Sequence, residues 1–280
     1  MAQIETYRAV ADAEVALAVA GVTSPFTIEV RFMGGLSPSQ QDAFRGAADR
    51  WIRLIVGDLP SLIVDGEVID DVLILAQGEA LDGPGGVLGQ AGSTALRPAS
   101  ANFLPAKGIM SFDQADLEQM EAAGTLDDVI THEMGHVLGI GRRLWQLRGF
   151  LSGAGTSNPI FTGPGAMEEY ARLRGGDPQP VPVANVGGLG TRDTHWREAV
   201  FANELMTGSI GNAGNPISRM TVASLGDLGY TVDIDAAEPY ELPNHLSLAE
   251  EGLVIPHTAP INVGIMLPTV PLVMPEENLQ

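Results

Sequence analysis

Two histidines four residues apart, with a glutamate directly after the first, are the residues most able to do chemistry. They lie in segment 131–139, which reads Thr-His-Glu-Met-Gly-His-Val-Leu-Gly. On a helix, His132 and His136 would project from one face and offer two imidazoles to a single zinc ion. Glu133 would lie beside the first ligand, within reach of a zinc-bound water as general base. The alternative is an amphipathic helix with two histidines on its polar face.

The residues around this motif predict a short helix that ends just after it. Thr125 followed three residues later by Asp128 resembles a capping box, and apolar residues between 126 and 138 supply a face for burial. Gly139 stands where helices commonly end in a left-handed residue. The chain is therefore expected to turn sharply there and to return a distant residue to the metal.

A catalytic zinc site needs a third protein ligand and an open fourth position. Besides the motif, the chain has three further histidines: His195, His245 and His257. The last two fall in a proline-rich tail, where exposed histidines are expected. Glu198 and Glu204 are rival ligands, as in zinc peptidases that use a glutamate. His195 is favoured, because those enzymes take the glutamate from a second helix and do not need Gly139.

The motif, Gly139, the distant His195 and Met206 together resemble the metzincin metalloendopeptidases. Most metzincins carry the third histidine three residues after the glycine, where this chain has Arg142. A long insertion before a His-Trp pair, followed by Glu-Leu-Met, is instead similar to the leishmanolysin family. The likeness covers roughly residues 25 to 232.

The resemblance implies one catalytic zinc, bound by His132, His136 and His195, with Glu133 polarising the attacking water. It also implies that Met206 forms the Met-turn, an apolar floor beneath the metal; an ordinary core methionine is the alternative. Unlike the disulfide-rich eukaryotic leishmanolysins, this chain has no cysteine, so no propeptide cysteine can mask the zinc. The resemblance is therefore to a cysteine-free, bacterial type of the family.

A possible calcium site lies upstream of the zinc helix, where carboxylates flank a glycine-rich turn. Calcium takes six to eight oxygen ligands, which include carboxylates and carbonyls. The pattern resembles the calcium loop of the matrixins, another metzincin group. That resemblance implies these ligands: Asp82, the carbonyls of Gly83, Gly85 and Val87, and the side chains of Asp113 and Asp116. An ordinary surface turn and helix cap is the alternative.

The composition limits the classes of partner. A net charge of −20 over 280 residues argues against nucleic acid and anionic membranes. No stretch is long and apolar enough to span a bilayer, and residues 9–22 are not a convincing signal peptide, because acidic residues interrupt them. By family resemblance we expect a secreted protein that acts on proteins or peptides; a cytoplasmic location is the alternative.

The pattern of elements predicts a twisted sheet with a backing helix and the active-site helix, and the resemblance implies an α+β, metzincin-like fold in which that sheet is mixed. A smaller irregular and helical C-terminal subdomain follows. Four parts are expected: an N-terminal segment at 1–24, a weak helix then a linker; a catalytic subdomain at 25–139; a second subdomain at 140–235 with the insertion, third ligand and Met-turn; and a proline-rich arm at 236–280. Strands are expected at 26–32, 68–76, 87–91 and 108–112, and helices at 38–56, 166–174 and 216–228.

The expected function is zinc-dependent hydrolysis of peptide bonds, with Glu133 passing the proton of the water to the leaving amine. Residues 87–91 are expected to be an edge strand above the cleft, where a peptide substrate adds as a further strand. Arg192 and Arg197 are candidates for oxyanion stabilisation, and Asp193 or Glu198 for orienting a zinc ligand. The alternatives are a dedicated processing protease, with the tail or N-terminal segment as internal substrate or plug, and a non-catalytic, metal-stabilised binding module.

Overall fold

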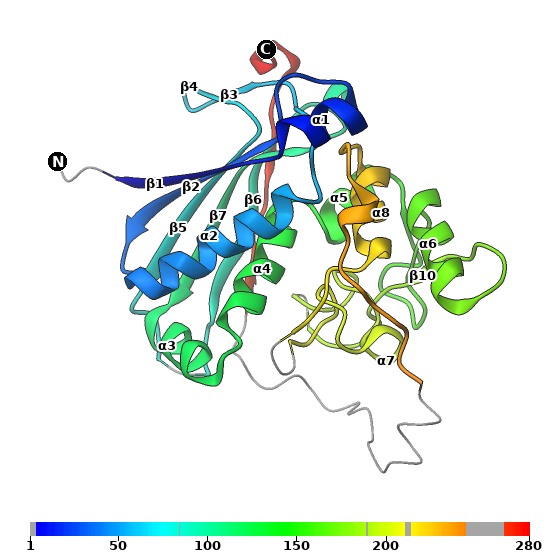
Figure 1. Ribbon diagram of the computed structural model, residues 1–280. Coiled ribbons are helices and arrows are strands. Elements are labelled where there is room, and N and C mark those ends of the chain that lie inside the picture. The colour runs from blue at the N-terminus through cyan, green and yellow to red at the C-terminus, as the bar shows by residue number, and fades with distance from the viewer. Residues whose placement is uncertain (1–3, 84, 189, 211–213, 245–265) are drawn as a thin grey trace.

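A twisted mixed β-sheet carries helices α2 and α4 side by side on one face (Figure 1). The computed structural model describes residues 4–83, 85–188, 190–210, 214–244 and 266–280. The strands are β1 (Glu5–Val10), β2 (Thr27–Gly34), β3 (Leu62–Val64), β4 (Glu67–Ile69), β5 (Val72–Glu79), β6 (Gly89–Leu96), β7 (Pro105–Asp113), β8 (Leu151–Ser152), β9 (Ile160–Phe161), β10 (Val181–Pro182), β11 (Met266–Pro268) and β12 (Leu272–Val273). The helices are α1 (Ala13–Ala20), α2 (Pro38–Ile52), α3 (Gln114–Ala123), α4 (Leu126–Val137), α5 (Arg142–Leu147), α6 (Pro164–Arg174), α7 (Glu198–Phe201) and α8 (Arg219–Leu228).

The main sheet has the order β1-β2-β5-β7-β6-β11, with β12 also paired to β6. The β2–β5 and β5–β7 pairs are parallel, whereas β1–β2 and β6–β7 are antiparallel. This confirms the expected mixed sheet. After α4, the chain adds a three-stranded sheet β10-β9-β8 and helices α5 to α8.

Local sequence accounts for the elements that hold the site. In β2, the buried Ile28, Val30 and Phe32 alternate with more exposed residues, as expected for a half-buried strand. Helix α2 begins at a capping box, in which Ser37 and Gln40 each bond the backbone of the other. Its Trp51 Nε1 donates to the carbonyl oxygen of Thr131 at 2.9 Å, which fixes α2 against the motif helix α4.

Several predictions about the elements were wrong. The N-terminal segment starts with a strand, β1, because Glu5–Val10 pair antiparallel with β2. The expected strand 68–76 is divided into β4 and β5, and α8 starts at Arg219 rather than 216 because Ser218 caps it. Thr125 makes no side-chain cap bond. Asp128 instead bonds Arg50 and the backbone of 214–215.

The largest correction concerns the strand above the cleft. β6 is longer than expected and is not an edge strand, because β11 and β12 of the C-terminal arm pair along its outer side. The arm is drawn in red beside β6 in Figure 1. The sequence predicted a proline-rich arm at 236–280 but not that this arm covers the edge of β6.

One continuous hydrophobic core includes residues from β2, α2, α4, α8 and the insertion. Trp145 of the insertion stacks on Trp196, which follows it, with ring centroids 4.9 Å apart. The core therefore crosses the expected boundary at 139/140, and the division into two subdomains stays a prediction. In the described part of the chain, no helix has the length and apolarity needed to cross a bilayer.

Candidate metal centre

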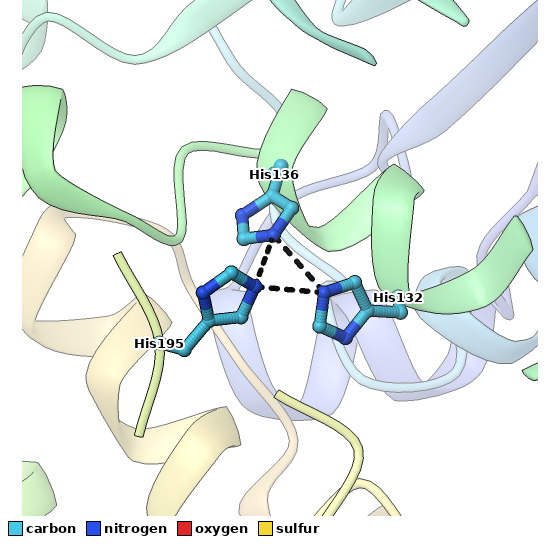
Figure 2. A group of neighbouring side chains, drawn as sticks. All are labelled: His132, His136 and His195. Atoms are coloured by element: carbon cyan, nitrogen blue, oxygen red, sulfur yellow. Dashed lines mark hydrogen bonds between the residues drawn. The ribbon is translucent and has the colours of Figure 1, made fainter. Parts of the chain in front are cut away.

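Three imidazoles converge at the junction of α4 with the insertion. His132 and His136 project from one face of α4, and His195 enters from the loop that follows β10 (Figure 2). The Nε2 atoms lie 3.1 Å apart between His132 and His136, and each is 3.0 Å from the Nε2 of His195. The structure thus brings the three sequence-predicted ligands together.

The opposite ring nitrogens show which atoms are free to bind. Nδ1 of His132 lies 2.7 Å from the carbonyl oxygen of Leu205, and Nδ1 of His136 lies 2.8 Å from that of Ile140. Nδ1 of His195 lies 3.0 Å from the carbonyl oxygen of Thr191. Since a carbonyl only accepts, each Nδ1 carries the proton and each Nε2 keeps its lone pair.

Three lone pairs that face one another so closely cannot hydrogen bond, whereas a cation among them would satisfy all three. Tetrahedral ligands about 2.0–2.1 Å from zinc stand about 3.3–3.4 Å apart, so small shifts from the present spacing suffice. Burial and the neighbouring His136 lower the pKa of His132 to about 3. Burial likewise lowers the pKa of His136 and of His195. The rings are therefore neutral, as metal ligands must be.

Glu133 lies beside the three histidines and lines the same cavity, whose volume is about 780 Å³. Its side chain is buried, and burial raises its pKa to about 8. The cavity also touches Arg142, Thr269 and Pro271. One carboxyl group and three imidazoles that could hold a metal ion therefore face the same cavity.

Gly139 and Met206 both lie next to α4. Gly139 has φ 101°, and a β-carbon there would lie 2.3 Å from Leu144 Cδ2, so the sharp turn after α4 requires glycine. Met206 is fully buried, and its sulfur would lie 2.8 Å from a β-carbon added to Gly135, between the two ligands of α4. This contact agrees with a floor beneath the histidines.

Glu204, a rival ligand in the sequence, faces away from the histidines. One of its carboxylate oxygens accepts from the Met206 N–H at 2.7 Å. The other accepts from the N–H and hydroxyl of Ser218, at 3.1 and 2.7 Å, and from the hydroxyl of Thr221. Glu204 therefore joins the turn that carries Met206 to the start of α8.

The candidates for oxyanion stabilisation near His195, Arg192 and Arg197, bind backbone carbonyls of the insertion. Arg192 donates to the carbonyls of Gly155 and Thr156, and Arg197 donates to that of Val183. Both guanidinium groups are therefore held by backbone that belongs to the insertion. Trp196 is fully buried in the hydrophobic core and donates from Nε1 to the Thr221 hydroxyl.

Asp193 and Glu198 are also placed differently from the sequence expectation. Asp193 is buried and accepts from Gly155 N–H, and one of its oxygens lies 3.6 Å from Arg142, the residue at the usual third-ligand position. Glu198 begins α7, and burial raises its pKa. The direct hydrogen-bond partner of His195 is instead Thr194, 2.7 Å from Nδ1, together with the Thr191 carbonyl. Sequence reasoning missed these partners, because main-chain acceptors have no residue signature.

The geometry does not support the calcium hypothesis. One oxygen of Asp113 caps α3, and the other accepts from Leu81 N–H at 2.7 Å. Asp116 accepts from Gly85 N–H at 2.8 Å, and Asp82 accepts from Val87 N–H. Among the described residues, these three carboxylates do not form a group close enough to hold one metal ion. Gly83 N–H also donates to Asp113. The loop therefore turns N–H groups toward the carboxylates, whereas a calcium site needs carbonyl oxygens there.

Comparison with protein families agrees with this geometry. The leishmanolysin family model matches residues 95–248, more than half of the chain. The chain belongs to the leishmanolysin family. The leishmanolysin match spans both ligands of α4, His195, Met206 and α8, and it identifies the protein as one of a family of metallopeptidases. No curated protein sequence matches the chain significantly.

Proposed function

We propose that the protein is a zinc-dependent endopeptidase that hydrolyses peptide bonds in proteins or peptides. The observation that carries the proposal is the convergence of three Nε2 lone pairs, 3.0–3.1 Å apart, in the cavity that Glu133 lines. A zinc ion held by His132, His136 and His195 would lower the pKa of a bound water and polarise the scissile carbonyl.

The residues of the chain supply the proton transfers and the orientation. Glu133 is the only carboxylate that lines the cavity among the described residues, so it is assigned as the base that takes a proton from the attacking water. It then gives the proton to the leaving amine. The Leu205, Ile140 and Thr191 carbonyls hold the rings so that Nε2 points inward.

The test is cleavage of casein by the zinc-loaded protein and by Glu133→Gln. We expect the variant to lose at least about a hundredfold in kcat and to keep its zinc, because general acid–base catalysis contributes roughly 10²–10⁴-fold. Glu121→Gln, an exposed glutamate on α3, is the matched control and should cleave normally.

The same assay separates the two alternative functions. Zinc-loaded protein that cuts neither casein nor a peptide library would contradict the endopeptidase and favour a binding module. One cut in one partner would favour a processing protease. Zinc content by mass spectrometry must accompany each assay, because inactive metal-free protein decides nothing.

A further inference from the structure

At the outer edge of β6, the chain lays a peptide strand of its own beside the candidate site. Met266, Leu267 and Pro268 of β11 lie opposite Gly89, Gln90 and Ala91 in parallel register. Leu272 and Val273 of β12 then lie opposite Ala95 and Leu96. The segment 266–273, called here the docked arm, therefore follows β6 along almost its whole length.

The same segment forms a wall of the catalytic cavity. Thr269 and Pro271 line that cavity together with the three histidines and Glu133, and so do Ala91 and Gly92 of β6. A peptide that adds to the outer edge of β6 would have to enter the space that the docked arm fills. The edge that sequence reasoning assigned to substrate is therefore taken by the chain itself.

A close approach between Gly92 and Thr269 shows how tightly the arm is fitted. A β-carbon on Gly92 would lie 2.4 Å from the Thr269 hydroxyl oxygen, and Gly92 has φ 143°. Any other residue there would press on the arm as well as strain the strand. Val270, the next residue, is 91% exposed, so the arm contacts the cleft with one side only.

The two ends of the docked arm are held unequally. Beyond it, Met274 N–H donates to Leu96, Asn278 Nδ2 to Ile63 and Gln280 N–H to Ser61, each at 2.7–2.9 Å. Met274 and Leu279 also pack against the small core beneath β3. By contrast, β11 has three paired residues, and Pro268 has no N–H to donate. The part beside the cleft can therefore leave while the C-terminus stays attached.

We propose that residues 266–271 of the docked arm are an internal, displaceable competitor for the peptide-binding edge of β6, so that substrate must replace them before cleavage. This inference rests on the proposed function, because the edge has a substrate only if the protein cuts peptides. The partner that the surface fits is an extended peptide strand, and its resting occupant is the chain's own C-terminal segment.

The first experiment replaces residues 266–271 with a Gly/Ser segment of equal length and leaves the anchor 272–280 intact. If the arm is docked about nine-tenths of the time, the KM for casein should fall about tenfold with kcat little changed. Val270→Ser, which alters only an exposed side chain of the arm, is the control and should match the original protein. An unchanged KM in a folded, zinc-loaded variant would overturn the proposal.

A binding measurement distinguishes failure of the arm proposal from failure of the proposed function. A fluorescent peptide with the sequence of residues 263–274 should bind the Gly/Ser variant and bind the original chain at least about tenfold more weakly. A scrambled peptide should bind neither. If neither protein cuts casein but the peptide discriminates between them, the proposed function is wrong, while the arm still competes with peptide for the edge of β6. Equal binding to both proteins overturns the arm proposal.

If the Gly/Ser variant does not fold, hydrogen exchange on the unaltered chain tests the arm proposal. Saturating peptide should speed amide exchange at residues 267 and 269, and leave exchange at 274, 278 and 280 unchanged. Exchange that does not respond to the peptide at any of these amides would overturn the proposal.

Discussion

The carbonyl oxygen of Leu205 lies 2.7 Å from Nδ1 of His132, so the turn before Met206 orients the first ligand of the motif helix. Residues more than seventy positions apart thus share one hydrogen bond. The turn is itself fixed by Glu204, which accepts from Met206 N–H and from the start of α8. Zinc affinity should therefore depend on residues that never touch the metal.

Glu204→Gln tests that dependence. The amide would set its NH₂ group against backbone and hydroxyl donors, so we expect the free energy of unfolding to fall by about 1–3 kcal/mol. Zinc affinity should fall about 10–100-fold, because the Leu205 carbonyl loses its fixed position. Competition with a chromogenic chelator measures the affinity. Ser218→Ala, which keeps the carboxylate, should cost less; folded Glu204→Gln with unaltered zinc affinity would contradict the role.

Gly135→Ala tests how closely Met206 packs against α4. The added β-carbon would lie 2.8 Å from the Met206 sulfur and 3.0 Å from the Trp51 ring, so we expect a loss of about 1–3 kcal/mol of stability. Urea unfolding of the metal-free protein measures it.

A matched substitution in another helix isolates the effect of this contact. Gly226→Ala in α8 meets its nearest neighbour at 3.4 Å, an ordinary contact, and should stabilise by up to about 1 kcal/mol through helix propensity. Gly135→Ala should lower the free energy of unfolding less in the Met206→Ala background than in the original chain, because the sulfur that it contacts is then absent. Stabilisation by Gly135→Ala in the original background would mean that Met206 does not press on the helix.

Removal of zinc should lower stability, because the three Nε2 lone pairs then face one another without a cation. At a free zinc concentration about a thousand times Kd, binding adds about 4 kcal/mol. Thermal unfolding with and without chelator, beside metal analysis, measures this. We expect about one zinc per chain, lost in His195→Ala and kept in His257→Ala, a histidine outside the described residues. Full zinc occupancy in His195→Ala would remove His195 from the ligand set.

Asp128 should make stability depend on acid pH. Burial alone would raise its pKa, but bonds from Asn215, Gly214 and Arg50 outweigh burial and hold the pKa below the ordinary value. A carboxylate with a lowered folded-state pKa stabilises the fold above its unfolded pKa, about 3.9, and this contribution is lost as pH falls through the folded value.

The effect of Asp128→Asn on the free energy of unfolding should therefore depend on pH. The variant should be about 1–3 kcal/mol less stable than the original chain at pH 7. The difference should shrink as pH falls below about 4. Urea unfolding of both metal-free proteins over that range measures it, and a difference that grows on acidification would show that the sign is wrong.

The sequence indicated the fold class well, because the period of its apolar residues repeats the geometry of the elements. The alternation in β2 and the capping box of α2 are local patterns that few backbones satisfy. The cap of α4 failed for the opposite reason. Asp128 bonds Arg50 and Asn215, which are distant in sequence, and these partners displaced the local capping bond.

The sequence by itself determined the chemistry of the centre. The spacing of His132, Glu133 and His136 on one helix fixes two candidate ligands and a carboxylate, and the positive φ of Gly139 needs a residue without a side chain. Only the tertiary structure decided that His195 rather than Glu204 completes the set, and that the C-terminal arm covers β6. Those outcomes depend on which distant surfaces pack together, and a local pattern carries no record of that packing.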